Sequence, residues 1–213
     1  MPDALIILEK ELIDIYKVKT IKRIEEIDQC AQFLINHQLW DKEYKPEAFG
    51  RMAVLEGYGV VITMTAMEVN PLRRYHEKDD PVYNDSALEA FLNFSTEHST
   101  KEYLNFEMNA NGAMLSEFGM NRNRRKLKSF LSCSADCKSK IREDSWEVTL
   151  KIPMALIQEV YQREPLKSGD LFTCNFYKIS EDPAIEHYAS YAPIVSNTPN
   201  FHLPEFFGKA IIL

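Results

Sequence analysis

Glycine is scarce in this sequence: only seven occur among 213 residues, and none belongs to a glycine-rich phosphate loop. The G-x-S-x-G and H-E-x-x-H motifs and the loop pattern of EF-hands are missing as well. These absences exclude the familiar sequence signatures of nucleotide-binding proteins, serine hydrolases and zinc proteases. Any chemistry must therefore come from residues that only the fold brings together.

Long apolar runs are also lacking. No stretch approaches the ~20 residues of a membrane-spanning helix, so we expect no membrane partner. The longest apolar run near the N-terminus, Ala4 to Leu8, has no basic residues before it and does not resemble a signal peptide. We expect a cytoplasmic protein if Met1 is the native start, and a secreted one if a signal peptide was removed.

Cysteine is limited to four residues, Cys30, Cys133, Cys137 and Cys174. Their spacing is irregular, and no further Cys or His lies nearby at the spacing of a zinc site. The pattern predicts unpaired thiols, with a Cys133–Cys137 disulfide as the alternative.

An excess of positive charge is absent too. The chain has 25 Lys and Arg against 32 Asp and Glu, a net charge of −7, so no nucleic-acid partner is expected. The exception is the segment from Arg122 to Lys128, with five positive charges in seven residues. In an acidic chain this segment favours a solvated loop or a contact to an acidic sugar.

Aromatic residues, in contrast, are abundant, with 12 Phe and 10 Tyr. They fall in short alternating runs between turn signals, which is typical of antiparallel sheets. In the run from Ala87 to Phe94, Leu88 and its alternate neighbours share one face, and Glu89 lies on the other. The dipeptide at 111–112, Asn-Gly, predicts a hairpin. Strands are expected at Val18 to Ile27, Phe49 to Leu55, Val60 to Val69, Ala87 to Phe94, Glu102 to Asn109, Ala113 to Phe118, Trp146 to Ile152, Leu171 to Ile179 and Lys209 to Leu213.

Two short helices complete the expected elements. Asp28 is a suitable N-cap for a helix from Gln29 to His37, and a second helix is expected from Met154 to Gln162. Many short strands with little helix predict an all-β protein, an antiparallel β-sandwich. No linker or repeat divides the chain, so residues 1–213 are expected to form one domain.

A long polar loop from Arg73 to Asp85 holds the most suggestive side chains. It combines guanidinium groups, carboxylates and flat phenol rings, a mixture that suits a polyhydroxylated ligand, although a solvated connection is the alternative. Asp79 and Asp80 with Asp85 could instead gather Ca²⁺. Further along, Tyr188 or Tyr191 could present a ring at a cleft.

Six segments in order carry a family resemblance: Asp85 to Leu92, Tyr103 to Gly112, Trp146 to Pro153, Asn175 to Lys178, His187 to Pro193 and Pro199 to Gly208. In order and spacing they resemble the carbohydrate-binding module family 9-like domains, part of a DOMON-like β-sandwich superfamily. The resemblance covers roughly residues 45 to 213.

This resemblance implies a jelly-roll-like sandwich that binds a saccharide without catalysis, clamping a sugar between two aromatic rings. It also implies that Ca²⁺ is a candidate structural ion, while no other cofactor is required. Tyr191 stands where the family commonly has Trp, and Tyr75 or Tyr83 would form the opposite wall. The hydrogen-bonding residues are then expected to be Arg74, Asp85, Glu89, Asn175 and Lys178. The oligomeric state is left open.

Three alternatives remain at this point. A glycan-processing hydrolase would use Glu89 and Glu107, or an aspartate of the 79–85 loop, as paired carboxylates. A haem carrier would need Met64, Met67 or Met108 to converge with His76 or His187. A protein-interaction scaffold that has lost its ligand would have a closed cleft.

Overall fold

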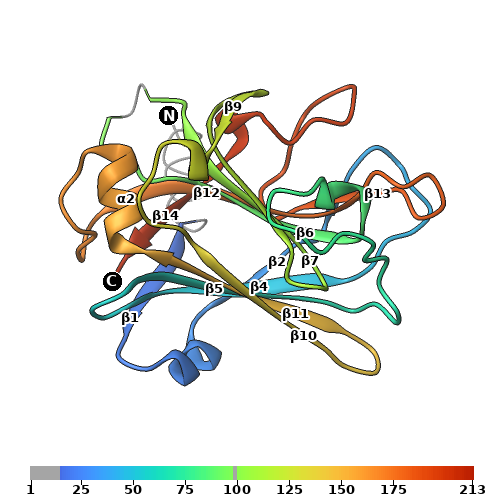
Figure 1. The fold of residues 1–213 in the computed structure, drawn as a ribbon, viewed down its shortest axis with the longest axis horizontal. Helices are drawn as coiled ribbons and strands as arrows, with labels where there is room; N and C mark the ends of the chain where they lie inside the picture. The colour runs from blue at the N-terminus through green and yellow to red at the C-terminus, as the bar shows by residue number, and fades with distance from the viewer. Residues whose placement is uncertain (1–14, 98–99) are drawn as a thin grey trace, which may run out of the picture.

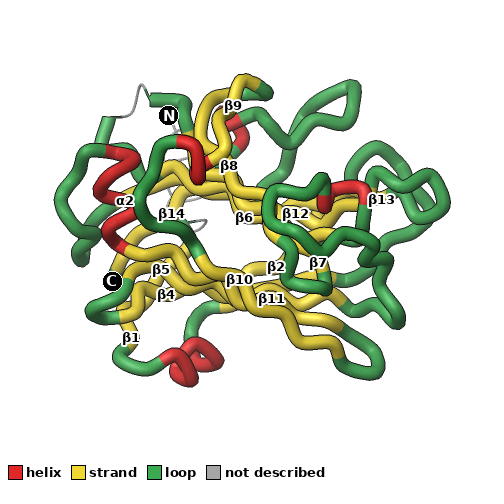
Figure 2. The backbone as a smooth tube through the Cα atoms, viewed as in Figure 1, coloured by secondary structure: helices red, strands yellow, loops and turns green. Residues whose placement is uncertain are grey.

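The computed structural model describes residues 15–97 and 100–213, so the apolar run at 4–8 lies outside the described residues. Fourteen strands of the described chain form a curled sheet that folds into two facing layers (Figure 1). Figure 2 shows these layers as two sets of strands with loops at their ends. The all-β sandwich expected from the sequence is confirmed.

The first layer, sheet A, contains most of the long aromatic strands. In chain order its strands are β3 (His37–Gln38), β6 (Ala87–Asn93), β7 (Tyr103–Asn109), β8 (Met114–Met120), β9 (Asn123–Lys126), β12 (Leu171–Ser180), β13 (His187–Ser190) and β14 (Gly208–Ile212). Sheet B consists of β2 (Gln32–Leu34), β4 (Ala48–Leu55), β5 (Gly59–Ala66), β10 (Asp136–Ile141) and β11 (Trp146–Pro153).

Strand β1 (Tyr16–Ile21) connects the two layers. Its first half pairs with β14 and its second half with β4, both in parallel, whereas the other strand pairs of the described chain are antiparallel. Helices are few: α2 (Met154–Tyr161) and the 3₁₀ turns η1 (Ile24–Gln29), η2 (Val82–Asn84), η3 (Leu127–Ser129) and η4 (Pro204–Phe206).

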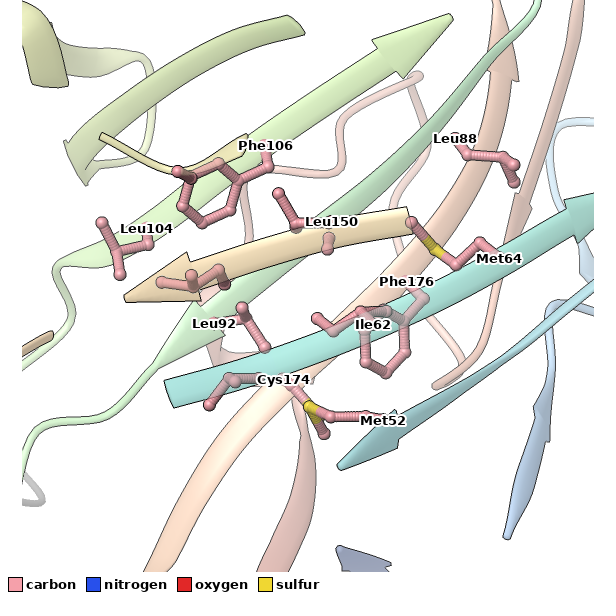
Figure 3. Packing of buried hydrophobic residues seen from close by; sticks show 14 of the residues in the cluster. Met52, Ile62, Met64, Leu88, Leu92, Leu104, Phe106, Leu150, Cys174 and Phe176 are labelled. Carbon is pink, nitrogen blue, oxygen red and sulfur yellow. The ribbon is translucent and has the colours of Figure 1, made fainter. Parts of the chain in front are cut away.

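The main core lies between the layers. On β6 the inward positions are Leu88, Ala90 and Leu92, as the alternation predicts, and they meet residues of β5 and β11 from the opposite sheet. Figure 3 shows part of this packing, from Met52 and Ile62 of sheet B to Phe106 and Phe176 of sheet A. The Phe33 ring of β2 stacks on Phe176 with centroids 3.8 Å apart, which fixes the two sheets against each other.

Sheet A has a second apolar cluster on its outer face. It contains Phe91, Tyr103 and Tyr177 from the sheet, and Phe201 and Phe207 from the C-terminal segment that covers them. Because alternate strand residues point to opposite faces, Glu89 of β6 and Glu107 of β7 belong to this outer face too. The outer face of sheet A is therefore covered rather than solvated.

Two local predictions near the N-terminus are wrong. The expected strand from Val18 to Ile27 ends at Ile21, and η1 follows it. The expected helix from Gln29 to His37 is instead strand β2, which pairs with β4, and the short strand β3. In this segment Phe33 and Ile35 are buried while the residues between and after them are exposed, which is the period of a strand.

Other local predictions are confirmed. The helix after Pro153 runs from Met154 to Tyr161. Strands β7 and β8 form the expected hairpin, and Gly112 in its loop takes a positive φ of 80°. All four cysteines are free thiols.

No described helix has both the length and the apolar character needed to cross a membrane.

Candidate functional site

A cavity of about 270 Å³ opens beside the outer face of sheet A. Strands β6, β7, β9, β12 and β13 contribute to it, and the C-terminal segment and η2 supply further walls. Its size is near the lower end of ordinary ligand sites, ~300–1,000 Å³, so it suits one or two small rings. It is lined by Tyr83, Glu89, Glu107, Arg122, Arg124, Ile179, Glu181, Tyr188, Pro199, Asn200, Phe201 and His202.

Two buried carboxyl groups line this cavity. Glu89 and Glu107 are direct partners in the β6–β7 register and are only 2% and 3% exposed. Residues that face each other across antiparallel strands have Cβ atoms roughly 4.5–5.5 Å apart. The neighbouring-strand placement expected for these two residues is therefore confirmed, and they share one cavity.

The Glu107 carboxyl is only half satisfied. Its Oε1 accepts a hydrogen bond from Asn105 Nδ2 at 2.6 Å. Its Oε2 is buried and has no hydrogen-bond partner among the described residues. A buried polar atom without a partner costs about 1–3 kcal/mol, so a ligand that donates a hydrogen bond here gains more than it would in water.

Both carboxyls hold their protons unusually tightly. Burial, together with the charges of Glu117 and Glu181, raises the pKa of Glu107 to about 7, although Arg124 acts in the opposite direction. Burial and the neighbouring Glu107 raise the pKa of Glu89 well above its ordinary value. Glu107 is therefore mostly protonated below pH 7, and burial disfavours the ionised form of Glu89 as well.

Arginine side chains from the β8–β9 hairpin form another wall. The Arg124 Nε lies 3.0 Å from Glu117 Oε2, and its guanidinium also donates to the carbonyl of Asn121. Arg122, in contrast, is exposed at the edge of the cavity. The inner arginine is thus held by its own carboxylate, and Arg122 is free to meet solvent or a ligand.

The C-terminal segment supplies aromatic walls whose positions are fixed by stacking. Phe201 stacks on Tyr177 with centroids 4.1 Å apart, and the His202 ring stacks on Phe91 at 5.1 Å. His202 Nδ1 lies 2.8 Å from the Tyr103 hydroxyl. Burial, and then the nearby arginines, lower the pKa of His202 to about 3, so its ring is neutral at physiological pH.

Of the side chains expected to bind a ligand, Tyr83 and Glu89 line this cavity. The neighbouring loop is instead held together by contacts among Arg74, Tyr75 and Asp85. Asp85 is fully buried and accepts hydrogen bonds from the backbone N–H groups of Arg74 and Tyr75 at 2.9 and 3.0 Å. Arg74 Nε lies 3.3 Å from the same carboxylate.

Asn175 and Tyr191 lie away from this cavity. The Asn175 side-chain oxygen accepts the backbone N–H groups of Phe176 and Ala192, so it holds the chain after β13 in place. The Tyr191 ring packs near Phe33 and Phe176 and lines a different, larger cavity of about 1,110 Å³. Tyr191 and Tyr83 therefore do not face each other across one cleft.

Lys178 is fully buried between the sheets. Its Nζ lies 3.2 Å from Glu68 Oε2, 2.5 Å from Ser86 Oγ and 2.8 Å from His187 Nε2. Burial alone would raise the pKa of Glu68, but Lys178 and hydrogen bonds from Ser86 and Trp146 lower it to about 2. None of these network residues lines the cavity, and their mutual contacts hold sheet A against the neighbouring segments.

The loop aspartates proposed for Ca²⁺ have other partners. Asp79 Oδ2 lies 2.6 Å from the Lys128 ammonium, and the Asp80 carboxylate accepts the backbone N–H groups of His76 and Glu77. Within residues 15–97 and 100–213, no three His, Cys, Asp or Glu side chains gather as metal ligands would.

The residues considered for haem do not converge either. Met64 and Met108 belong to the apolar core between the sheets, while Met67 is 38% exposed. The Nε2 of His187 lies beside Lys178, and its Nδ1 is 2.6 Å from the carbonyl of Ile185.

Sequence reasoning missed several cavity residues. Glu181, Asn200 and His202 lie in segments with no periodic pattern to mark their direction. Arg122 belongs to the basic segment, for which a sugar contact was one interpretation.

Comparison with known proteins agrees with this architecture. A structure of a candidate carbohydrate-binding protein from Bacteroides uniformis matches with a TM-score of 0.75 and 23% identity, over 92% of this chain and 98% of that one. A family 9 carbohydrate-binding module from Caldicellulosiruptor kristjanssonii is similar in complexes with glucose and with cellotriose, with TM-scores of 0.67 and 0.66. The sequence identity is 11% for both complexes. Each alignment covers 92% of this chain, with 94% of the chain in the glucose complex and 92% of the chain in the cellotriose complex.

No curated protein sequence matches the chain. The model of carbohydrate-binding family 9, in contrast, matches residues 19–212, which is nearly the whole described fold. The chain therefore belongs to carbohydrate-binding family 9.

Proposed function

We propose that this protein binds a saccharide in the 270 Å³ cavity beside the outer face of sheet A, without cleaving it. The unpartnered Oε2 of Glu107, buried in the cavity wall, is the observation that carries the proposal. A sugar hydroxyl donates hydrogen bonds of the kind that this oxygen lacks. Family membership and the glucose and cellotriose complexes of a similar fold support the same ligand class.

The walls of the cavity suit a sugar ring. Aromatic rings of Tyr83, Tyr188 and Phe201 offer apolar faces for the C–H groups of a pyranose. Glu181, Asn200 and Arg122 provide polar groups at the edge for hydroxyls. We infer that the sugar enters from the side of Arg122, because this residue is exposed.

A hydrolase is the second candidate, because Glu89 and Glu107 share the cavity. Retaining and inverting mechanisms both need one carboxylate ionised and the other protonated, which requires environments that move the two pKa values apart. Here burial raises the pKa of both groups. Burial thus disfavours the ionised carboxylate that a nucleophile or general base needs, which favours binding over hydrolysis. An assay with aryl glycosides tests this: release of aglycone that Glu89→Gln abolishes would support the hydrolase.

Isothermal titration calorimetry with glucose and cellotriose tests the binding proposal. We expect Tyr83→Ala to weaken binding about tenfold, as loss of one stacking surface of about 1.4 kcal/mol would do. Tyr75→Ala is the matched control, since Tyr75 packs in the same small apolar cluster as Tyr83 but does not line the cavity.

Tyr191→Ala separates this site from the other cavity. Unchanged affinity in Tyr191→Ala is expected, because Tyr191 lines the larger cavity. Absence of heat with both sugars at millimolar concentration, or equal losses in Tyr83→Ala and Tyr75→Ala, would refute the proposed site.

A further inference from the structure

Acidic groups outnumber basic groups around the cavity. The carboxyl groups of Glu89, Glu107 and Glu181 line it, against the guanidinium groups of Arg122 and Arg124. Arg124 is already paired with a fourth carboxylate, that of Glu117.

The other titratable groups packed around the pair do not restore the balance. Lys178 points to the opposite face of β12 and is paired with Glu68. His202 is neutral, because burial and the arginines lower its pKa to about 3. The buried floor of the cavity therefore has more acidic than basic groups, and Arg124, which acts on both carboxyls, is already paired with Glu117.

The geometry of the floor adds a second observation. Glu89 and Glu107 face each other directly across β6 and β7, and Glu107 Oε2 has no partner among the described residues although the side chain is 97% buried. One group placed between them could bond to both. A hydroxyl has a single O–H to donate and brings no charge, whereas an ammonium has three N–H donors and a full positive charge.

Building on the sugar site proposed above, we propose that its preferred ligands are amino sugars with a free, protonated amine. The ammonium would lie between the carboxyls of Glu89 and Glu107 and donate to the unpartnered Oε2. The pyranose ring would lie against the aromatic walls, and the remaining hydroxyls would reach the polar edge.

Binding of an amino sugar should release protons to the buffer. In the free protein burial disfavours the ionised form of both carboxyls, since it raises the pKa of each. An ammonium stabilises the ionised carboxylates, so binding expels a proton from the pair to the buffer. A neutral sugar stabilises the ionised forms far less and releases correspondingly little.

Calorimetry at pH 6.5 with glucosamine, N-acetylglucosamine and glucose tests the preference. N-acetylglucosamine is the matched ligand, because it has the same ring with a neutral amide in place of the amine. We expect glucosamine to bind at least about tenfold tighter than either neutral sugar, the usual advantage of a charge-assisted contact. In buffers of different ionisation enthalpy, glucosamine should release protons on binding.

Variants identify the responsible carboxyl. Glu107→Gln should reduce the preference for glucosamine over glucose to less than about threefold, whereas Glu147→Gln, on sheet B outside the cavity, should leave this preference unchanged. Circular dichroism checks that both variants fold. The proton-release measurement uses the unmodified protein and does not depend on this check.

The outcomes separate the two proposals. Glucose binding as tightly as glucosamine, or glucosamine binding without proton release, overturns the amino-sugar preference and leaves the sugar site intact. No binding of any of the three sugars overturns the sugar site and this inference with it.

Discussion

Replacing Glu107 by glutamine should change how the stability of the protein depends on pH. In the unfolded chain this carboxyl ionises near 4.5, while in the folded protein burial raises its pKa to about 7. Between these values the folded state holds a proton that the unfolded state has lost, so stability falls as pH rises. At about 1.4 kcal/mol for each tenfold change in proton affinity, the loss is about 3 kcal/mol above pH 7.

Glutamine has no proton to lose, so Glu107→Gln should escape this loss. Urea denaturation of both proteins at pH 4.5, 5.5, 6.5 and 7.5 measures the difference. Its absolute value includes a constant cost, because the new amide group occupies the position of the unpartnered Oε2. The informative quantity is the change with pH: the variant should gain about 3 kcal/mol relative to wild type between pH 4.5 and 7.5.

Parallel stability curves, or a variant that loses stability relative to wild type as pH rises, would refute the raised pKa of Glu107. Parallel curves would mean that the carboxyl ionises equally easily in both states and is well solvated or paired. Glu147→Gln, on the partly exposed face of β11, is the control and should show no such trend.

Three further predictions concern the fold, each measured by urea denaturation. Lys178→Met should cost about 3–5 kcal/mol, because it leaves Glu68 buried without its cation, and a cost under about 1 kcal/mol would contradict this. Phe176→Ala should cost about 3–5 kcal/mol through the cavity it leaves; full retention of stability would refute its role in the core. Gly59→Ala should cost more than Gly57→Ala, since only at Gly59 would the new Cβ collide with backbone, at 2.2 Å; equal costs would disagree.

Alternation of apolar residues carried the fold prediction. In the run from Ala87 to Asn93, alternation predicted correctly which residues point toward the core and which point to the outer face. The inward residues belong to the core between the sheets, and the outward ones contact the outer apolar cluster. The helix predicted from Gln29 to His37 was wrong, because over nine residues the apolar pattern fits both a helical and a strand period. Pairing of β2 with β4 decided between them, and such long-range pairing leaves no local signal.

The candidate site was predictable only in part. Strand alternation puts Glu89 and Glu107 on two successive predicted strands, but only the structure shows that they pair directly across β6 and β7. Asn175 and Lys178 are polar residues on a strand and were therefore expected to bind a ligand. Only the structure shows that Asn175 accepts a backbone hydrogen bond from Ala192 and that Lys178 is paired with Glu68. Glu181 and Asn200 reach the cavity through loops, whose paths depend on the packing of the whole domain.

A crystal structure of the protein grown with glucosamine or glucose would show where the sugar binds. We expect one sugar ring beside the outer face of sheet A, with a polar group bonded to Glu107 Oε2 and the ring against Tyr83. A sugar bound in the other cavity beside Tyr191, with the Glu89–Glu107 cavity empty, would contradict it.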